Sequence, residues 1–274
     1  MRLFAISDLH LASAVNREAL AALPAYPDDW LIVAGDVAER LDRMDEALAL
    51  LVDRFARVLL TPGNHDLWAS GNGGPRGVAR YEAVIELARG HGVLTPEDPY
   101  LEWPGRCPPG IDRLMLVPMF LLYDYSFRPA EVDFVDVIAW AEETHNVCGD
   151  EIHLSPEPFA SRVAWCHARL AETERRLHAE RPEDAATVLA NHWPLRRDLV
   201  RIPRVPRFTP WCGTLRTADW HRRFHAHAVV SGHLHTRRTD WIDGTRFEEV
   251  SLGYPRQWDH GRGVEGYLRE ILPG

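Results

Sequence analysis

The sequence has 274 residues, of which 46% are hydrophobic and 26% are charged, which is ordinary for one large globular domain. We therefore expect one domain over residues 1–274. The formal net charge of −9 argues against a surface that binds long nucleic acid, because such a surface needs an excess of Lys and Arg. No stretch approaches the roughly 20 apolar residues of a membrane span and no secretory pattern opens the chain, so we expect a cytoplasmic protein without a membrane partner.

The four cysteines are far apart in the chain and form no Cys-x-x-Cys pair. The sequence therefore indicates neither a disulfide framework nor a zinc site made of thiolates. We expect reduced, structural thiols at Cys107, Cys148, Cys166 and Cys212.

Short apolar runs with β-branched residues alternate with helical patterns, which is typical of an α/β fold. The expected strands, in chain order, are residues 3–7, 31–34, 58–62, 113–120, 187–190 and 228–231. Helical patterns occupy residues 41–55 and 76–89, and a longer one lies within residues 156–180.

Five of these expected strands lead directly into a polar motif. The motifs are Asp8-Leu9-His10, Gly35-Asp36, Gly63-Asn64-His65-Asp66, Asn191-His192 and Gly232-His233-Leu234-His235. Because ligands gather beyond the carboxyl ends of strands in open α/β sheets, the five motifs can converge on one point. We expect Gly35, Gly63 and Gly232 to let the backbone turn sharply there.

Each motif alone has an ordinary structural explanation, since Asp and Asn favour caps and turns, and a lone histidine is more often a core residue than a ligand. Together they contain the oxygen and imidazole ligands that suit Mn, Fe or Zn. Two pairs, Asp8 with His10 and His233 with His235, are two residues apart and in extended chain would point to the same side.

The ordered set of motifs, from Asp8 to His235, resembles the signature of the calcineurin-like metallophosphoesterases. The resemblance implies two packed mixed β-sheets flanked by helices, a four-layer sandwich, with two metal ions at the strand ends. It implies that the first ion is held by Asp8, His10, Asp36 and His235. It implies that the second ion is held by Asp36, Asn64, His192 and His233, with Asp36 as the bridge. We expect Mn or Fe at both positions, with Zn as the alternative.

The same resemblance makes His65 a catalytic residue that is not a ligand, placed to protonate the leaving oxygen or to stabilise the transition state. Asp66 would hold its imidazole, and Glu39 would orient a ligand without binding metal. The structural alternative for His65 is a role in the turn at Asn64. Two cations lower the pKa of a shared water and neutralise phosphoryl charge, so the expected reaction is hydrolysis of a phosphate ester.

Residues 121–156, between the third and fourth motifs, are rich in aromatic and acidic side chains. We expect them to form a lid or cap over the site, with Tyr123 and Tyr125 contacting substrate. The equal alternative is a packing insertion with a small core of its own.

An arginine-rich segment follows His192, in which a single acid, Asp198, stands among five arginines. Its prolines exclude a regular helix, so we expect an extended loop. Arginine suits the recognition of phosphate or carboxylate groups, and a solvated surface loop is the alternative. The residues of this segment expected to bind substrate are Arg196, Arg197, Arg201, Arg204, Arg207 and Trp211.

Residues 209–221 and 247–258 resemble a group of actinobacterial metallophosphoesterases that includes a phosphopantetheinyl hydrolase. The resemblance implies hydrolysis of a phosphodiester that releases 4′-phosphopantetheine from a holo acyl or peptidyl carrier protein. The sequence leaves open a phosphomonoesterase of phosphoproteins or metabolites, and a nucleotide phosphodiesterase. A non-catalytic protein-binding scaffold is disfavoured because every ligand position is present. The oligomeric state is not indicated.

Overall fold

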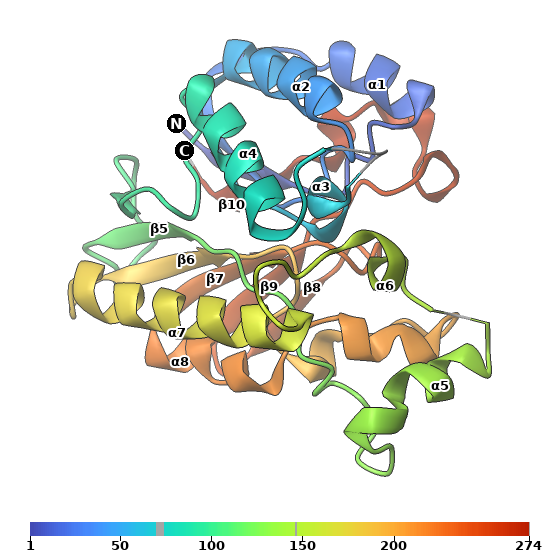
Figure 1. Ribbon diagram of the computed structural model, residues 1–274. Helices are drawn as coiled ribbons and strands as arrows, with labels where there is room; N and C mark the ends of the chain where they lie inside the picture. Colours follow the sequence, from blue (N-terminus) through green and yellow to red (C-terminus); the bar gives the residue numbers. More distant parts are fainter. Residues whose placement is uncertain (70–73, 146, 274) are drawn as a thin grey trace.

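Two β-sheets lie face to face in the computed structural model, and helices cover the outer face of each (Figure 1). The structure describes residues 1–69, 74–145 and 147–273. The layers therefore run helix, sheet, sheet, helix, and the expected four-layer architecture is confirmed.

The first sheet has four strands in the order β10-β1-β2-β3. Strands β1 (Leu3–Ile6), β2 (Tyr26–Val33) and β3 (Phe55–Leu60) are parallel, and β10 (Arg269–Leu272) is antiparallel to β1. Three helices cover its outer face in Figure 1: α1 (Ala14–Ala21), α2 (Leu41–Arg54) and α4 (Gly77–Gly90). The three parallel strands end at the same edge of the sheet. The motifs that follow them can therefore converge, as predicted.

The second sheet has six strands in the order β4-β5-β6-β7-β9-β8. Its parallel centre consists of β5 (Leu114–Pro118), β6 (Ala186–Ala190), β7 (Ala226–Ser231) and β9 (Thr245–Glu249). The antiparallel edges are β4 (Leu101–Glu102) and β8 (Thr239–Ile242). Helices α7 (Arg162–Glu180) and α8 (Trp220–Arg223) cover the outer face in Figure 1.

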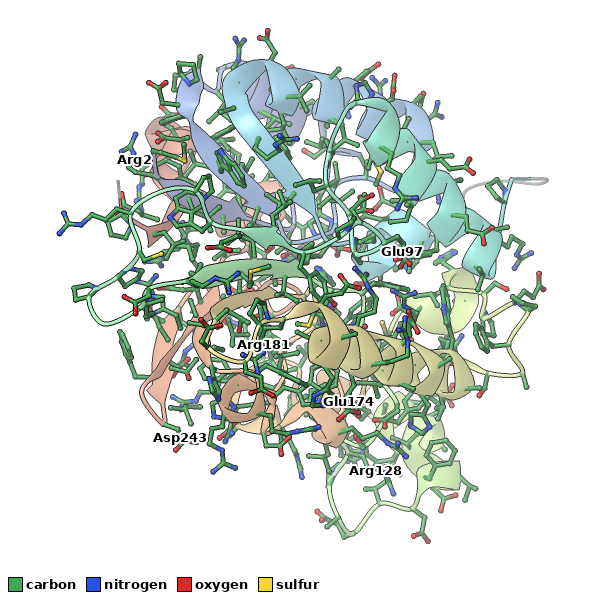
Figure 2. All side chains as sticks on the ribbon, turned by 90° about the vertical axis from the view of Figure 1, so that its left-hand side faces the viewer. Arg2, Glu97, Arg128, Glu174, Arg181 and Asp243 are labelled. Carbon is green, nitrogen blue, oxygen red and sulfur yellow. The ribbon has the colours of Figure 1, made fainter. Side chains whose placement is uncertain are left out.

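The inner faces of the two sheets bury a common apolar core, and side chains fill the space between the layers (Figure 2). Leu3 and Ala5 of β1 point into this core, together with Val188 of β6. The alternate residues Phe4 and Ile6 pack instead against the helices of the first layer. Strands that are apolar on both faces are typical of parallel sheets covered on both sides, which explains the unbroken apolar runs in the sequence.

The remaining helical segments are short. They are α3 (Asn64–Leu67), α5 (Val137–Glu142), α6 (Asp150–His153), and the 3₁₀ helices Phe134–Asp136, Arg197–Leu199, Pro206–Trp211, Leu215–Thr217, Pro255–Gln257, His260–Arg262 and Glu265–Tyr267. Two of them lie in the arginine-rich segment, so the prediction of an extended loop there is wrong. Proline excludes an α-helix, but its fixed φ fits the first position of a 3₁₀ turn, where Pro206 lies.

The first part of the predicted lid belongs to the core. Tyr123 is fully buried and Tyr125 is 7% exposed, in the apolar cluster that also contains Trp165 of α7. The following segment, with α5, projects from the body of the molecule in Figure 1. Residue 146 of the predicted lid lies outside the described residues. The packing alternative therefore describes residues 121–127, and Val132, Val137, Ala141, Cys148 and Leu154 are buried in the same cluster. A lid remains a prediction for the exposed remainder of the segment.

None of the helices in the described ranges is long and apolar enough to span a membrane. The four cysteines are free. Cys107 is partly exposed, and the other three are buried.

Candidate metal centre

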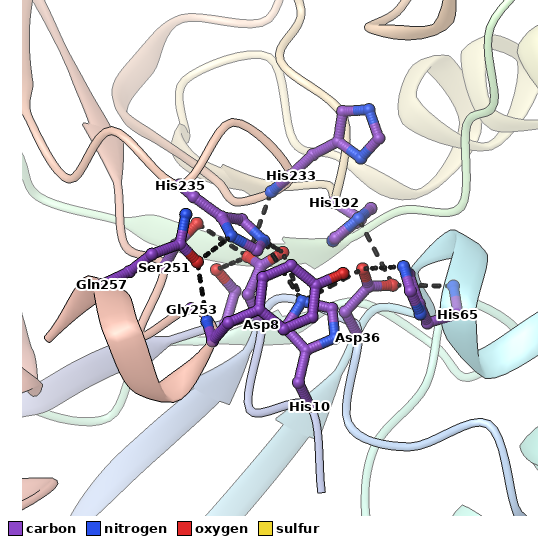
Figure 3. A network of polar contacts seen from close by, with 12 residues as sticks. Asp8, His10, Asp36, His65, His192, His233, His235, Ser251, Gly253 and Gln257 are labelled. Atoms are coloured by element: carbon purple, nitrogen blue, oxygen red, sulfur yellow. Dashed lines mark hydrogen bonds and ion pairs between the residues drawn. The ribbon is translucent and has the colours of Figure 1, made fainter. Parts of the chain in front are cut away.

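The predicted metal ligands lie at the ends of β1, β2 and β3 in the first sheet and of β6 and β7 in the second. Figure 3 shows six of the seven, all but Asn64, gathered in one place. In each of three groups of residues, the potential ligand atoms all lie within 4.8 Å of one another. The groups are Asp8 with His10 and His235, His10 with Asp36 and His65, and Asp8 with Asp36 and His192. The structure thus brings together residues that are up to 227 positions apart.

At one end of the cluster, the Nε2 atoms of His10 and His235 lie 3.1 Å apart, and His235 Nε2 lies 2.9 Å from Asp8 Oδ1. His235 Nδ1 faces the Oε1 atom of Gln257 at 2.7 Å, an oxygen that can only accept. Nδ1 therefore carries a proton, which leaves Nε2 as a donor atom for a cation. Burial opposes a charge on His235, but the Asp8 carboxylate outweighs it and raises the pKa of His235 to about 9. The negative potential of the site thus favours positive charge.

At the other end, His192 Nδ1 donates to the backbone carbonyl of Ala34 at 2.8 Å. Its Nε2 then has a lone pair, and it faces Asn64 Oδ1 at 3.1 Å and Asp36 Oδ1 at 3.5 Å. Three atoms that all accept, and that converge in a buried place, fit a cation between them. The donor set of carboxylates, one amide and imidazoles suits a dinuclear centre without thiolates.

Among the predicted His and Asp ligands, His233 alone belongs to none of the three donor groups, although its ring centroid lies 5.1 Å from that of His192. Its imidazole points away from Asp8 in Figure 3, and its ring centroid lies 5.7 Å from that of Phe208. A hydrogen bond of 3.0 Å from its backbone N–H to Asp8 fixes the backbone in this orientation. Its Nε2 atom is buried without a hydrogen-bond partner among the described residues, and burial lowers the pKa of His233 well below its ordinary value.

At five of the seven predicted ligands the backbone is left-handed rather than extended. The angle φ is 55° at Asp8, 44° at His10, 55° at Asp36, 71° at His233 and 52° at His235. The prediction that the two i, i+2 pairs lie in extended chain is therefore wrong. Such angles cost about 1–3 kcal/mol each in residues other than glycine, and strain of this kind gathers at active sites.

The glycines of the motifs serve two purposes. Gly35 has φ +88° and makes the sharp turn that the sequence predicts. Gly63 has φ −100°, so the prediction of a turn made possible by glycine is wrong there. A Cβ atom at Gly63 would lie 2.2 Å from Asp36 Oδ1, and one at Gly232 would lie 2.4 Å from Asp8 Oδ2. These two glycines leave room for ligand carboxylates.

Hydrogen bonds from the protein hold one oxygen of Asp8 and leave the other for the cluster. Oδ2 accepts from Ser7 Oγ at 2.6 Å, from Ser251 Oγ at 2.8 Å and from the N–H of His233. Oδ1 faces His235. The carboxylate is therefore fixed in direction before any cation binds.

Glu39, and not Asp66, holds the imidazole of His65. The Nδ1 atom of His65 lies 2.8 Å from Glu39 Oε1, and its ring stacks on Trp68 with centroids 3.8 Å apart. Asp66 is fully buried and accepts instead from the N–H groups that follow β2 and β3, those of Asp36, Val37, Ala38 and Gly63. Burial opposes protonation of His65, but Asp36 and Glu39 outweigh it and raise the pKa of His65.

Two residues that contact the ligands carry no signal in the metal motifs. Gln257 orients His235 through the contact with its Nδ1 atom, and Tyr254 stacks on His10 with centroids 4.3 Å apart. Both lie in residues 247–258, which the sequence marks through resemblance alone. The run Gly-Tyr-Pro-Arg-Gln, which follows β9, is the sequence feature from which their role could have been predicted.

A cavity of about 410 Å³ opens above the cluster. Its lining includes Asp36, Asn64, His65, Trp68, His145, Val147, Cys148, Phe208, His233 and Tyr254. A second groove of about 610 Å³ adjoins it, and the two share Ile202, Val205, Leu234, His235 and Gln257. Three arginines line this groove: Arg201, Arg204 and Arg256. The groove therefore extends a mixed apolar and basic surface away from the metal centre.

The structure contradicts the expected substrate contact of three aromatic residues. Tyr123 and Trp211 are fully buried, and Tyr125 is nearly so. The hydroxyl of Tyr125 and the indole N–H of Trp211 both donate to Glu151 at 2.7 Å. These residues pack beneath the site, because their rings complete the core that covers the second sheet.

The five predicted arginines divide into a pair held by nearby acids, a pair that lines the groove, and Arg197, which does neither. Arg196 pairs with Asp198 at 2.7 Å, and Arg207 pairs with Glu143 at 2.6 Å. Arg201 and Arg204 line the basic groove, whereas the exposed Arg197 does not.

Comparison with known proteins defines the class. The chain belongs to the calcineurin-like phosphoesterases, since the model of that family matches residues 1–237. It is 48% identical over 276 aligned positions to the acyl-carrier-protein phosphodiesterase PptH of Mycobacterium tuberculosis, covering 99% of this chain and 83% of that protein. The crystal structure of the phosphopantetheinyl hydrolase PptH from Mycobacterium tuberculosis matches with a TM-score of 0.92 at 46% identity, covering 100% of this chain and 96% of that chain. The protein is therefore a phosphoesterase with a dinuclear metal centre.

Proposed function

We propose that this enzyme hydrolyses the phosphodiester that joins 4′-phosphopantetheine to a serine of a holo acyl or peptidyl carrier protein. The observation that carries the proposal is the 48% identity, over 99% of the chain, to a protein named for that activity. We expect the enzyme in the cytoplasm, together with its carrier-protein substrate.

The reaction adds water to phosphorus and breaks the bond between phosphorus and the serine oxygen. In the proposal, His65 gives the proton on its Nε2 atom to the serine oxygen as it leaves. The contact of Nδ1 with Glu39 supports this role, because it leaves Nε2 as the nitrogen that faces the cavity. The products are the serine hydroxyl of the apo carrier protein and free 4′-phosphopantetheine.

We assign the first cation to Asp8, His10, Asp36 and His235, and the second to Asp36, Asn64 and His192. His233 borders the same cavity, and a change of its side-chain rotamer is needed for it to become the fourth ligand of the second cation. Mn and Fe suit this mixture of oxygen and nitrogen donors, with Zn as the alternative. When bound, the pair supplies an activated water and neutralises the charge on the phosphoryl oxygens.

The two cavities offer separate surfaces for the two parts of the substrate. Trp68, Val147 and Phe208 give the metal cavity an apolar wall that suits the pantetheine arm. Residues 145 and 147–149 border this cavity, which supports a lid at the end of the 121–156 segment. Arg201 and Arg204 in the adjoining groove suit an acidic carrier protein.

The test is to assay purified, metal-loaded protein against a holo carrier protein, bis-p-nitrophenyl phosphate and p-nitrophenyl phosphate. We expect mass spectrometry to show conversion of the holo to the apo carrier protein. Hydrolysis of the small diester with an untouched carrier protein would refute the carrier substrate and leave a phosphodiesterase of another kind. Activity on the monoester alone would indicate a phosphomonoesterase.

A further inference from the structure

Asp150 is a buried acid that contacts the metal site without belonging to the ligand set. It is the first residue of α6, and its side chain is fully buried. Its Oδ1 atom accepts from Asn64 Nδ2 at 2.9 Å and from Trp68 Nε1 at 2.7 Å. One carboxylate oxygen therefore joins a proposed ligand to the residue that stacks on His65.

The contact with Asn64 decides which atom of its amide faces the centre. An asparagine side chain has an oxygen that accepts and a nitrogen that donates, and a cation binds the oxygen. Asp150 Oδ1 accepts from Nδ2, so this contact holds the amide with its nitrogen toward Asp150. The other amide atom, Oδ1, then faces His192 Nε2 at 3.1 Å.

The contact with Trp68 links the same carboxylate oxygen to a second residue of the cavity lining. The indole N–H is held by Asp150, and its ring lies under His65 with centroids 3.8 Å apart. The same carboxylate thus limits the movement of a ligand and of the proposed acid.

Asp150 is itself held by the core below it. The neighbouring Glu151 accepts from Tyr125 and Trp211 and pairs with Arg162. Arg162 Nη1 also donates to the backbone carbonyl of Asp150 at 3.2 Å. Two of the three aromatic residues that the sequence suggested for substrate binding, Tyr125 and Trp211, therefore anchor the segment that carries Asp150.

The second oxygen of Asp150 is buried without an N–H or O–H donor among the described residues, and the buried thiol of Cys148 lies beside the carboxylate. Burying a polar atom that is only partly satisfied costs stability, which a residue with a packing role alone does not require.

We infer that Asp150 is a positioning residue, which sets the amide of Asn64 for the second cation and fixes Trp68 beneath His65. The inference rests on the proposed ligand role of Asn64 and not on the identity of the substrate. Failure of the carrier-protein assay therefore leaves it standing, because its test measures metal binding.

The experiment is a calorimetric titration of metal-free protein with Mn²⁺, comparing wild type with Asp150→Ala and Asp150→Asn. We expect Asp150→Ala to weaken one of two sites by about 10- to 100-fold and to leave the other unchanged. Asp150→Asn keeps an oxygen that can accept from Asn64, so we expect its weaker site to recover most of that affinity.

Asp124→Ala is the matched control, because Asp124 is also a buried acid of the 121–156 segment and is bonded to Thr214 at 2.9 Å. We expect it to lower Tm without separating the two affinities. Equal weakening of both sites in Asp150→Ala, or no weakening of either, would overturn the inference.

A charge exchange keeps the inference testable if Asp150→Ala does not fold. Asn64→Asp places two carboxylates within hydrogen-bond distance, and Asn64→Asp combined with Asp150→Asn restores a donor and an acceptor with their places exchanged. We expect the double variant to bind Mn²⁺ at the weaker site at least about tenfold more tightly than Asn64→Asp alone. No recovery in the double variant would contradict a direct contact between the two side chains.

Discussion

The Nδ1 atom of His65 lies 2.8 Å from Oε1 of Glu39, and this contact leaves the other ring nitrogen for the cavity. We predict that His65→Ala keeps both metal ions while kcat falls by about 10²- to 10⁴-fold, the usual effect of losing a general acid. Glu39→Gln should lower kcat by a smaller factor, because it loosens the imidazole without removing it. Elemental analysis and steady-state kinetics check both variants, and loss of metal in His65→Ala would show that His65 is a ligand.

Asp36 has the most central place in the cluster. Its carboxylate belongs to the donor groups at both ends, one with His10 and one with His192. We predict that Asp36→Asn loses activity more completely than His10→Ala or His192→Ala, since both cations depend on this carboxylate. Elemental analysis should find at most one bound ion in Asp36→Asn, and two ions at wild-type affinity would exclude a bridging role.

The groove lined by Arg201, Arg204 and Arg256 should affect binding of the carrier protein and not the rate of phosphodiester hydrolysis. We predict that Arg204→Gln raises KM for a holo carrier protein and weakens its dependence on salt, because electrostatic attraction is screened over about 8–10 Å. Turnover of bis-p-nitrophenyl phosphate should be unchanged. Arg197→Gln is the control from the same segment and should change neither. Equal loss on both substrates in Arg204→Gln would mean that the groove shapes the metal centre.

The metal ions should stabilise the fold, because their proposed ligands come from both sheets. At a free metal concentration 100-fold above Kd, one bound ion contributes about 2.7 kcal/mol. We predict that a chelator lowers Tm by about 5–10 °C, measured by differential scanning calorimetry. Asp36→Asn should respond to the chelator much less. An identical shift in that variant would show that the chelator acts elsewhere.

Asp29 should contribute to stability against acid. Burial would raise the pKa of Asp29, but hydrogen bonds from Arg2, the closest at 2.7 Å, outweigh it and hold that pKa below its ordinary value. The unfolded state then binds more protons, so the contribution is complete above the unfolded pKa of about 3.9 and is lost as pH falls through the folded pKa. We predict that the difference in unfolding free energy between wild type and Asp29→Asn is constant from about pH 5 to 7 and shrinks below about pH 4.

The architecture and the residues of the motifs could be predicted because they depend on local patterns. Apolar runs mark the buried strands, and metal chemistry demands a few residue types directly after them. The contacts that orient these residues could not be predicted, because they join distant segments. Glu39 and His65 are 26 positions apart, and Asn64 and Asp150 are 86 apart.

The predicted lid is a second feature that the sequence alone could not settle. Aromatic residues suit a substrate surface as well as a core, and composition does not separate the two. The packing of α7 decides it, since Tyr123 lies in one apolar cluster with Trp165 and Leu170 of that helix. Likewise, the spacing of the motifs does not reveal the left-handed backbone at five of the ligands.

The pairing of β1 with β10 has a consequence for how the chain is made. Leu3 lies opposite Leu272, so the outer edge of β1 stays unpaired until β10 has also been synthesised. Closing so long a loop delays this contact relative to the local pairings of β2 and β3. The first sheet is therefore completed only when β10 pairs with β1. Until then, the unpaired edge of β1 is open to association with other nascent chains.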